Sequence, residues 1–294
     1  MSLVSDLKYK YKIAPIHEKF IFVNIGIFTI IAIINAVFFL GTKQHLTFFA
    51  EYLALPESLS KILYRFWTII TYNFLHFGLW HLLGNMIALY YFGRIFLTFF
   101  SVKQFINYYF LGGIFAGLIF IASYNVFPAL INENAILYGA SASVFAILLG
   151  ATTRSPNYEL NLFGVFRLKL WVFATLYVIS FIALIPLANT GGELAHLGGA
   201  LLGYIYTKQL DKGYDIGKGF ESIIARIMPL FERSTSKNLK TVYKDKSKVG
   251  GYTKGEFNEF NNQKKIDIIL DKISKSGYES LSAEEKEFLF KAGK

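Results

Sequence analysis

Long apolar runs, each close to the length of a helix that crosses a bilayer, fill the first two thirds of the chain. A transmembrane α-helix needs about 20 predominantly apolar residues. Six stretches reach or approach this length, at about residues 20–40, 79–100, 104–124, 138–153, 170–188 and 193–207. The fourth and sixth are short, which suits helices inside a bundle, where other helices and water shield their ends from lipid. The pattern predicts an all-α membrane protein with six transmembrane helices.

The segments around these stretches give the domain organisation. We expect a cytoplasmic N-terminal segment at 1–19, the six-helix core at 20–208, an amphipathic segment and linker at 209–262, and a cytoplasmic helical hairpin at 263–294. Apolar and basic residues at helical spacing in 217–233 favour a helix on the membrane surface. Residues 234–262 are rich in Lys, Asn and Gly, which is typical of a flexible linker.

Two local signals define the C-terminal hairpin. Gly277 follows an apolar stripe and is suited to end the first helix in a left-handed turn. Ser282 and Glu285 have the spacing of a capping box, which opens the second helix. Because about 30 residues bury little core alone, we expect this tail to dock on membrane or on a protein that the sequence does not name.

Composition supports a membrane protein and narrows its chemistry. The 294 residues are 54% hydrophobic and 17% charged, with a mean hydropathy of +0.41, whereas soluble domains carry about 25% charged residues. The net charge of +10 comes from lysines beside apolar stretches rather than on one docking face, so we expect no nucleic acid partner. The absence of cysteine excludes disulfides, a cysteine nucleophile and thiolate metal sites.

Basic residues set the expected orientation, because cytoplasmic segments of membrane proteins carry an excess of Lys and Arg. With the N-terminus inside, the inner segments hold Lys8, Lys10, Lys12, Lys19, Arg94, Lys103, Arg154, Arg167 and Lys169. The outer segments hold Lys43, Lys61 and Arg65, all in the long first loop at 41–75. We therefore expect both termini to be cytoplasmic in a bacterial-type inner (plasma) membrane. The first loop is expected in the outer interface, which its Trp and Tyr residues favour.

Three polar islands interrupt the apolar stretches, and polar groups in hydrocarbon are rarely without a function. They are His76–Asn85, Gly139–Ser143 and Ala195–Gly199. Each lies near the start of the second, fourth or sixth predicted helix, and these three helices all run from outside to inside. The predicted topology therefore brings the islands to one depth, in the outer leaflet.

Ser141 is the candidate nucleophile and His196 the candidate general base. A serine hydroxyl is a poor nucleophile until a base takes its proton. Ser143 is the competing nucleophile, but it lies about 200° further round the helix, so both serines cannot face one histidine. The alternative is that the small residues around Ser141, and the Gly199-x-x-x-Gly203 motif, only let helices pack closely.

Candidate groups for stabilising an oxyanion surround this nucleophile. His81 and Asn85 are four residues apart on one helix face, and both can donate hydrogen bonds, as can the backbone N–H of Ser141. Gly139 and Ala140 are expected to leave space for a substrate backbone and to support the same site. The alternative is that the histidines and Asn85 only hold the first turns of their helix and its loop together.

An orienting group is needed for the imidazole of His196. The apolar stretches contain no aspartate, so we expect a Ser–His dyad rather than a charge-stabilised triad, and no aspartyl chemistry. Phe145, one turn after Ser141 on the same face, is the candidate ring that stacks on the histidine. Glu193, one turn before His196, remains open as an orienting carboxylate or a residue of the loop rim.

Metal binding is the remaining chemical alternative. His76, at the mouth of the second helix, is expected to be structural or to help admit water. Three histidines at one level also suit zinc, but the chain has no His-Glu-x-x-His motif and no obvious carboxylate ligand. We therefore expect neither a metal nor a cofactor.

Taken together, the islands resemble the motifs of the rhomboid family of intramembrane serine proteases. The matching segments are HFGLWHLLGN (His76–Asn85), GASA (Gly139–Ala142) and AHLGG (Ala195–Gly199), in the family order. The resemblance covers roughly residues 15–208. The chain departs from the family pattern at Ala142, where glycine is common, at Phe145, where tyrosine is frequent, and at Thr68, where arginine often follows the tryptophan.

The resemblance implies a six-helix serine endopeptidase in which Ser141 is the nucleophile, His196 the base, and His81 with Asn85 line the oxyanion site. It implies transmembrane protein substrates, cut near the outer leaflet, and a tail similar to extensions on some bacterial members. Two alternatives stay open. A rhomboid-like protein that binds membrane clients without cutting would usually lack the serine or histidine. A channel or transporter is disfavoured because the spans lack charged pairs.

Overall fold

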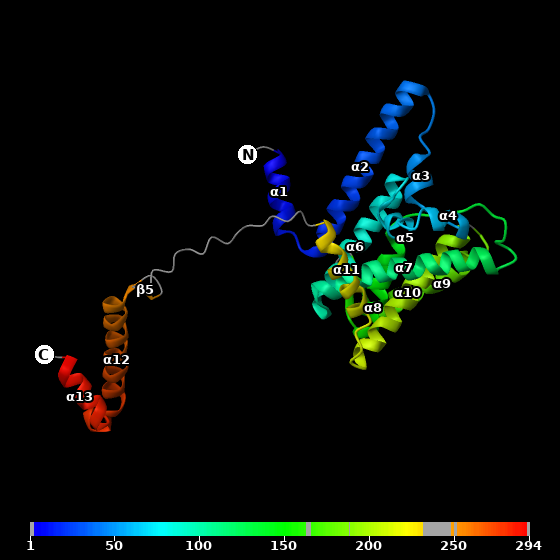
Figure 1. Ribbon diagram of the computed structural model, residues 1–294. Helices are drawn as coiled ribbons and strands as arrows, with labels where there is room; N and C mark the ends of the chain where they lie inside the picture. Colours follow the sequence, from blue (N-terminus) through cyan, green and yellow to red (C-terminus); the bar gives the residue numbers. More distant parts are fainter. Residues whose placement is uncertain (1–2, 163–165, 188, 232–247, 250–251, 293–294) are drawn as a thin grey trace. The chain divides into compact units, whose positions relative to one another are not determined.

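The computed structural model describes residues 3–162, 166–187, 189–231, 248–249 and 252–292. The chain forms two compact units, Met1–Phe231 and Glu232–Lys294, both drawn in Figure 1. Both are mostly helical, as predicted, and short strands join some of the helices.

Eight longer helices make up most of the first unit as described. They are α1 (Leu3–Ile13), α2 (Ile16–Thr42), α6 (Leu79–Phe99), α7 (Val102–Val126), α8 (Ser141–Arg154), α9 (Leu170–Leu184), α10 (Thr190–Asp211) and α11 (Gly217–Phe231). Six of them, α2 and α6 to α10, match the predicted apolar stretches to within a few residues at each end. Among the described residues, α2, α6 and α7 are long and apolar enough to cross a membrane, and α9 is a shorter apolar helix. That the protein has six transmembrane spans stays a prediction.

The long first loop is folded onto the bundle. It contains the short helices α3 (Phe48–Leu53), α4 (Leu59–Tyr64) and α5 (Thr68–Thr71) and the 3₁₀-helix η1 (Tyr72–Phe74). The indole N–H of Trp67 donates to the carbonyl of Tyr52 at 2.8 Å, and the Thr71 hydroxyl donates to the carbonyl of Leu53 at 2.8 Å. These bonds tie the end of the loop back to its start.

Short antiparallel strands were not predicted by the sequence. Strand β1 (Leu55–Pro56) in the first loop pairs with β2 (Ile136–Leu137), which lies just before α8. Strands β3 (Glu159–Leu162) and β4 (Phe166–Lys169) pair between α8 and α9, with Glu159 opposite Lys169. Strands of two to four residues are too short to show an alternating pattern. The β1–β2 pair matters most, because it fixes the segment that leads into α8.

The centre of the first unit is a close contact between α8 and α10. A side chain at Gly199 would collide with the carbonyl oxygen of Ala142, and one at Gly203 would collide with that of Ala146. On the other side of α8, a side chain at Gly112 of α7 would collide with the Ala146 methyl group. The structure therefore agrees with the predicted small-residue packing, which lets these helices approach more closely than larger residues allow.

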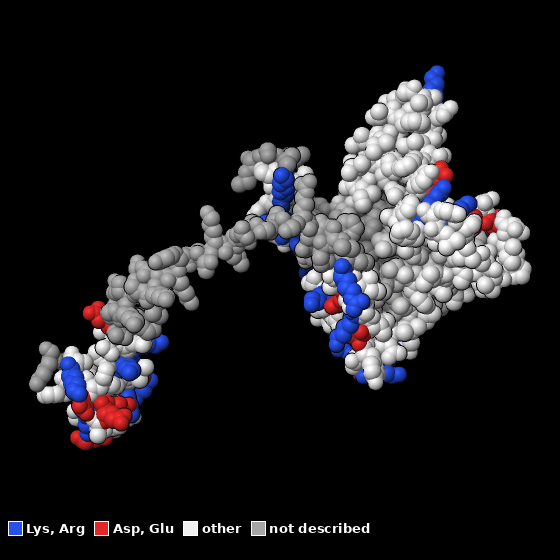
Figure 2. All heavy atoms as spheres, viewed as in Figure 1, with Lys and Arg blue, Asp and Glu red and all other residues white. Residues whose placement is uncertain are grey.

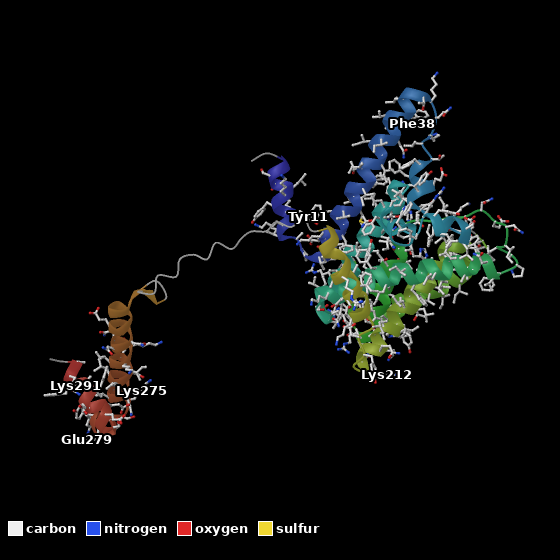
Figure 3. All side chains as sticks on the ribbon, viewed as in Figure 1. Tyr11, Phe38, Lys212, Lys275, Glu279 and Lys291 are labelled. Carbon is white, nitrogen blue, oxygen red and sulfur yellow. The ribbon has the colours of Figure 1, made fainter. Side chains whose placement is uncertain are left out.

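The two ends of the first unit differ in chemistry. Figure 3 labels Phe38, near the end of α2, and Lys212, just after α10, at opposite ends of this unit. In Figure 2 much of its visible surface is uncharged, while basic and acidic residues gather around α11, and a smaller group lies over the first loop, where Lys61 pairs with Glu57 and Arg65 with Glu51. At this charged end an ion pair between Arg154 and Asp211 joins the last turns of α8 and α10. The other end holds the polar islands.

Helix α11 is bound to α7 at the charged end. The side-chain amide of Asn107 donates to Glu221 at 2.8 Å, and the rings of Phe110 and Phe220 lie 5.9 Å apart. Ile223 remains exposed. The predicted amphipathic helix is therefore present, and its place on a membrane surface stays a prediction.

The second unit contains the predicted helical hairpin, with one difference. Its elements are β5 (Lys248–Val249), β6 (Tyr252–Thr253), α12 (Lys254–Ser276), the 3₁₀-helix η2 (Tyr278–Ser280) and α13 (Ala283–Ala292). Helix α12 begins earlier than the predicted residue 263, because a polar composition does not separate an exposed helix from a linker. Of the predicted linker 234–262, residues 234–247 and 250–251 lie outside the described residues.

The capping box of the hairpin turn has the predicted form, whereas Gly277 has the expected positive φ but an extended ψ of 162°, so α12 does not end in the predicted left-handed turn. Gly277 has a φ of 77°, and its N–H still closes the last turn of α12 at 2.8 Å from the carbonyl of Ile273. The Ser282 N–H donates to Glu285 at 2.7 Å, and the Glu285 N–H donates to the Ser282 hydroxyl at 3.2 Å. Lys272 of α12 also donates to Glu285 at 2.8 Å. The cap thus joins the two helices of the hairpin.

Gly199→Ala should lower the thermal stability of the detergent-purified protein, because the added methyl group meets the Ala142 carbonyl. Overpacking of this kind costs about 1–3 kcal/mol. Gly26→Ala in α2 is the matched control, since nothing lies within 4 Å of the added atom. Both changes gain the same helix propensity, so thermal melts followed by tryptophan fluorescence isolate the collision. Equal melting temperatures for the two variants would contradict the close contact.

The hairpin should loosen in acid through Glu285. Hydrogen bonds from the Lys272 side chain and from the Ser282 backbone hold the pKa of Glu285 below its usual value. Its contribution to stability is complete above the usual pKa and is lost as the pH falls through the lowered folded-state value. We expect protection of the α13 amides against hydrogen exchange to fall in that range, and Glu285→Gln to lack this step. Glu287→Gln, which removes an exposed i,i+4 ion pair with Lys291, should keep it.

Candidate active site

Ser141 is the first residue of α8, and the backbone before it is held from two sides. Gly139 has a φ of 110°, a conformation that favours glycine, and its N–H donates to the carbonyl of Tyr72 at 2.9 Å. The N–H of Ala140 donates to Nε2 of His76 at 3.4 Å. The island that the sequence predicted as His76–Asn85 therefore supports the loop that presents Ser141. His76 itself is buried.

The structure brings Ser141 and His196 together. Oγ of Ser141 lies 2.7 Å from Nε2 of His196, across the α8–α10 contact. With the ring proton on Nδ1, Nε2 accepts a hydrogen bond from the serine hydroxyl. This is the hydrogen-bonded arrangement of nucleophile and base that activates a serine.

Two aromatic rings pack on His196. The ring of Phe145, the predicted stacking residue, lies 5.2 Å from the imidazole and is tilted by 59°. The ring of Phe181 in α9 is closer, at 4.8 Å and 49°. Phe181 was missed because it is one of several aromatic residues in a uniformly apolar helix, and nothing in that sequence marks it. The histidine is thus confined by two tilted rings from two helices.

Glu193, which the sequence left open as an orienting carboxylate or a residue of the loop rim, lies beside His196. Its Oε2 lies 3.4 Å from Nδ1 of His196, one turn away on α10. Only 11% of the Glu193 side chain and 17% of the His196 side chain are exposed. The carboxylate therefore contacts the nitrogen opposite the one that faces Ser141.

His81 and Asn85 lie next to Gly139, two residues before Ser141. The nearest atoms to a side chain placed on Gly139 would be Cε1 and Nε2 of His81, at 2.7 and 2.8 Å, followed by Nδ2 of Asn85 at 3.9 Å. One N–H of Asn85 donates to the His81 carbonyl at 2.9 Å, within their own helix. The rings of His76 and His81 meet edge-on, 5.2 Å apart.

A cavity of about 520 Å³ opens onto Ser141, His196 and His81, and Asn85 is not among its lining residues. It is lined by Phe77, Gly78, His81, Ile136, Leu137, Tyr138, Ser141, Asn189, Gly192 and His196. Ser141 and His196 therefore border a space that is large enough for water. Its walls are formed by the residues that follow the first loop, by the β2 segment and by the start of α10.

Ser143 points away from this cavity. Its Oγ lies 2.7 Å from Oδ1 of Asn73 and 2.6 Å from the carbonyl oxygen of Tyr109, and the residue is fully buried. The rotation expected along the helix thus separates the two serines, one facing the cavity and one facing α7. Asn73, which no sequence signal singled out, anchors this buried bond.

No cluster of three or more His, Asp or Glu side chains able to hold a metal ion occurs in the part of the chain that the structure describes.

The family model for the Rhomboid domain matches residues 64–211, half of the chain, and this range contains all three islands. The chain belongs to the rhomboid family, whose members are typically intramembrane serine proteases, and its apolar helices agree with a membrane protein. A second model, for a family of unknown function (DUF6576), matches residues 256–291 and so covers the hairpin. No curated protein matches the chain closely enough to count as a relative.

Ser143→Ala should destabilise the protein, because it removes the hydroxyl whose single proton is shared by two buried acceptors, Oδ1 of Asn73 and the carbonyl oxygen of Tyr109. Losing a buried hydrogen-bond partner costs about 1–3 kcal/mol. Ser123→Ala is the matched control: Ser123 is also buried, but its hydroxyl bonds only to the Ile119 carbonyl of its own helix. Thermal melts in detergent should rank Ser143→Ala well below Ser123→Ala, and the reverse order would contradict a tethering role.

Proposed function

We propose that this protein is an intramembrane serine endopeptidase that cleaves transmembrane-helix substrates near the outer leaflet. The observation that carries the proposal is the 2.7 Å contact between Ser141 Oγ and His196 Nε2 beside a cavity. Membership of the rhomboid family supports the same reaction class. A serine endopeptidase of this kind needs no metal or cofactor for the steps below.

In the proposed reaction, Ser141 attacks the carbonyl carbon of the scissile peptide bond as His196 takes the hydroxyl proton. The imidazolium then gives this proton to the leaving amine, and an acyl-enzyme remains. Water then attacks the acyl carbon as His196 takes one of its protons. The ester bond to Ser141 Oγ breaks as the imidazolium returns that proton to Oγ, and the acyl group leaves as a carboxylic acid. The cycle returns both side chains to their starting forms.

The negative charge that develops on the substrate carbonyl oxygen would lie between the first residues of α8 and helix α6. The backbone N–H of Ser141, the ring of His81 and the amide of Asn85 are the proposed donors. Their support is the common position of both α6 residues beside Gly139. Each such donor is typically worth about 10²–10³-fold in rate.

The proposed topology has six spans formed by α2 and α6–α10, with both termini in the cytoplasm of a bacterial-type inner membrane. The basic residues near the α8 and α10 ends, including Arg154 and Lys208, support a cytoplasmic charged end. The islands then lie toward the outside, where water reaches the cavity. The lipid bilayer is the surrounding partner, and the substrate helix enters from it laterally.

A helical peptide bond is protected by its own hydrogen bonds, so the substrate must unwind locally before attack. Gly or Pro near the scissile bond should favour cleavage, because both weaken a helix. Small side chains should suit the limited space beside Gly139 and Ala140. A client-binding relative that does not cleave remains the second candidate class, and its distinguishing property is the absence of an activated serine.

Fluorophosphonate labelling separates these functions. The detergent-purified wild-type protein should be labelled covalently, because His196 activates the Ser141 hydroxyl. Ser141→Ala should abolish labelling and cleavage of a reporter transmembrane substrate. Ser143→Ala should remain labelled wherever it is folded, since Ser143 faces Asn73.

Two outcomes would contradict the proposal. Labelling that survives Ser141→Ala but is lost in Ser143→Ala would identify Ser143, and not Ser141, as the nucleophile. Absence of labelling and of cleavage in folded wild-type protein would favour a client-binding protein or a channel.

A further inference from the structure

We propose that helix α11 and the turn before it bind the acidic headgroups of the surrounding bilayer. The segment concerned, residues 212–226, is called the α11 surface below, and its partner is a layer of anionic phospholipid. The inference rests on the proposed membrane topology and is independent of the proposed protease function.

Helix α11 contacts the bundle within the thickness of a bilayer. The Phe220 ring lies 5.9 Å from that of Phe110, the ninth residue of the long apolar helix α7. Helix α7 has 25 residues, so it is about 37 Å long and Phe110 lies about 12 Å from its first residue. A bilayer with its headgroups is about 40–45 Å thick. A helix held against Phe110 therefore meets lipid rather than bulk water.

Hydrogen bonds from the bundle fix the inner side of the α11 surface. The Tyr206 hydroxyl of α10 donates to Asp215 Oδ1 at 2.6 Å, and the Gly217 N–H donates to the same oxygen at 2.9 Å. The Asn107 amide of α7 donates to Glu221 at 2.8 Å. A side chain at Gly217 would collide with the Tyr206 hydroxyl. This segment is thus seated on α7 and α10, and its outward side is fixed.

The same bonds separate the charges of the α11 surface. Its two carboxylates, Asp215 and Glu221, bond to side chains of the bundle. Its three basic residues, Lys212, Lys218 and Arg226, are exposed. Among the described residues, no carboxylate lies within ion-pair distance of these three. The outward side is therefore basic, which is complementary to acidic headgroups.

Apolar side chains extend past the part of α11 that α7 covers. The exposed fractions are 69% for Tyr214, 55% for Ile223 and 39% for Ile224. Ile223 follows Phe220 by three residues, so it continues the helix face that packs on Phe110. An exposed apolar edge beside basic residues is typical of a helix that lies in the bilayer interface.

The first experiment locates Ile223. Because the chain has no cysteine, Ile223→Cys gives a single site for an environment-sensitive fluorophore in the full-length protein. The protein is placed in bilayers that contain phosphatidylglycerol on both faces, so the result does not depend on orientation. We expect blue-shifted emission that nitroxide-labelled lipid quenches.

Ser222→Cys is the matched control. Ser222 is exposed and lies four residues from both Lys218 and Arg226, so it is on the basic side of the same helix. A fluorophore there should stay closer to water and be quenched less than one at Ile223. Equal quenching at the two positions would contradict the proposed orientation of α11.

Two other results would overturn the proposal. Water-like emission from the Ile223→Cys fluorophore would show that this face of α11 lies in solvent. A blue shift without quenching by labelled lipid would show that protein covers the face, either the C-terminal hairpin or a second copy of the chain.

The second experiment tests recognition of acidic headgroups. Detergent-purified protein with the fluorophore at Ile223→Cys is titrated with phosphatidylglycerol, and phosphatidylcholine is the uncharged comparison. Each basic side chain near an acidic surface strengthens binding about fivefold, so Lys218→Gln with Arg226→Gln should raise the half-maximal concentration about 25-fold. Phosphatidylcholine should give no such dependence on these two residues.

Lys264→Gln with Lys265→Gln is the control for charge. Both lysines are exposed on α12, in the other unit, so this pair removes the same charge away from the α11 surface. Its titration should match that of the protein with all four basic residues. Equal half-maximal concentrations for the two double variants would overturn the recognition of acidic lipid by α11, and melting temperatures measured in parallel confirm that both are folded.

Discussion

The contact between α8 and α10 is the constraint on which the rest of the structure depends. Gly199 lies against the Ala142 carbonyl with no room for a side chain. Ser141 comes immediately before Ala142, and His196 lies one turn before Gly199. The 2.7 Å distance between Ser141 Oγ and His196 Nε2 is therefore set by two backbones held in contact rather than by long flexible side chains. A site built this way is preorganised before any substrate arrives.

Other groups around the α8–α10 contact hold the loop before Ser141, confine the His196 ring and join the far ends of the two helices. The His76–Asn85 island holds the loop before Ser141, because the ring of His76, which precedes α6, accepts a hydrogen bond from the Ala140 N–H. The rings of Phe145 and Phe181 confine the imidazole, and Glu193 contacts its far nitrogen. At the opposite end, the Arg154–Asp211 pair joins the same two helices where hydration is available. Both ends of the α8–α10 pair are thus fixed.

Sequence alone predicted the features that depend on length, spacing and direction. Apolar length gave the long helices, and the direction of α6, α8 and α10 brought Ser141 near His196. Features that depend on tertiary packing were not visible. Phe181 is one aromatic residue among many in α9, the β1–β2 pair is too short for periodicity, and Asn73 finds its partner Ser143 only after folding. Glu193 was visible, but its direction toward Nδ1 depends on the rotamer that packing selects.

The β1–β2 pair connects the first loop to the segment that leads into Ser141. Leu55 is opposite Leu137 and Pro56 is opposite Ile136, and only three residues separate Leu137 from Ser141. Leu55 is also fully buried, so the pairing cannot slide without emptying its pocket. A displacement of the first loop therefore carries over, through this short ladder, to the residues immediately before Ser141.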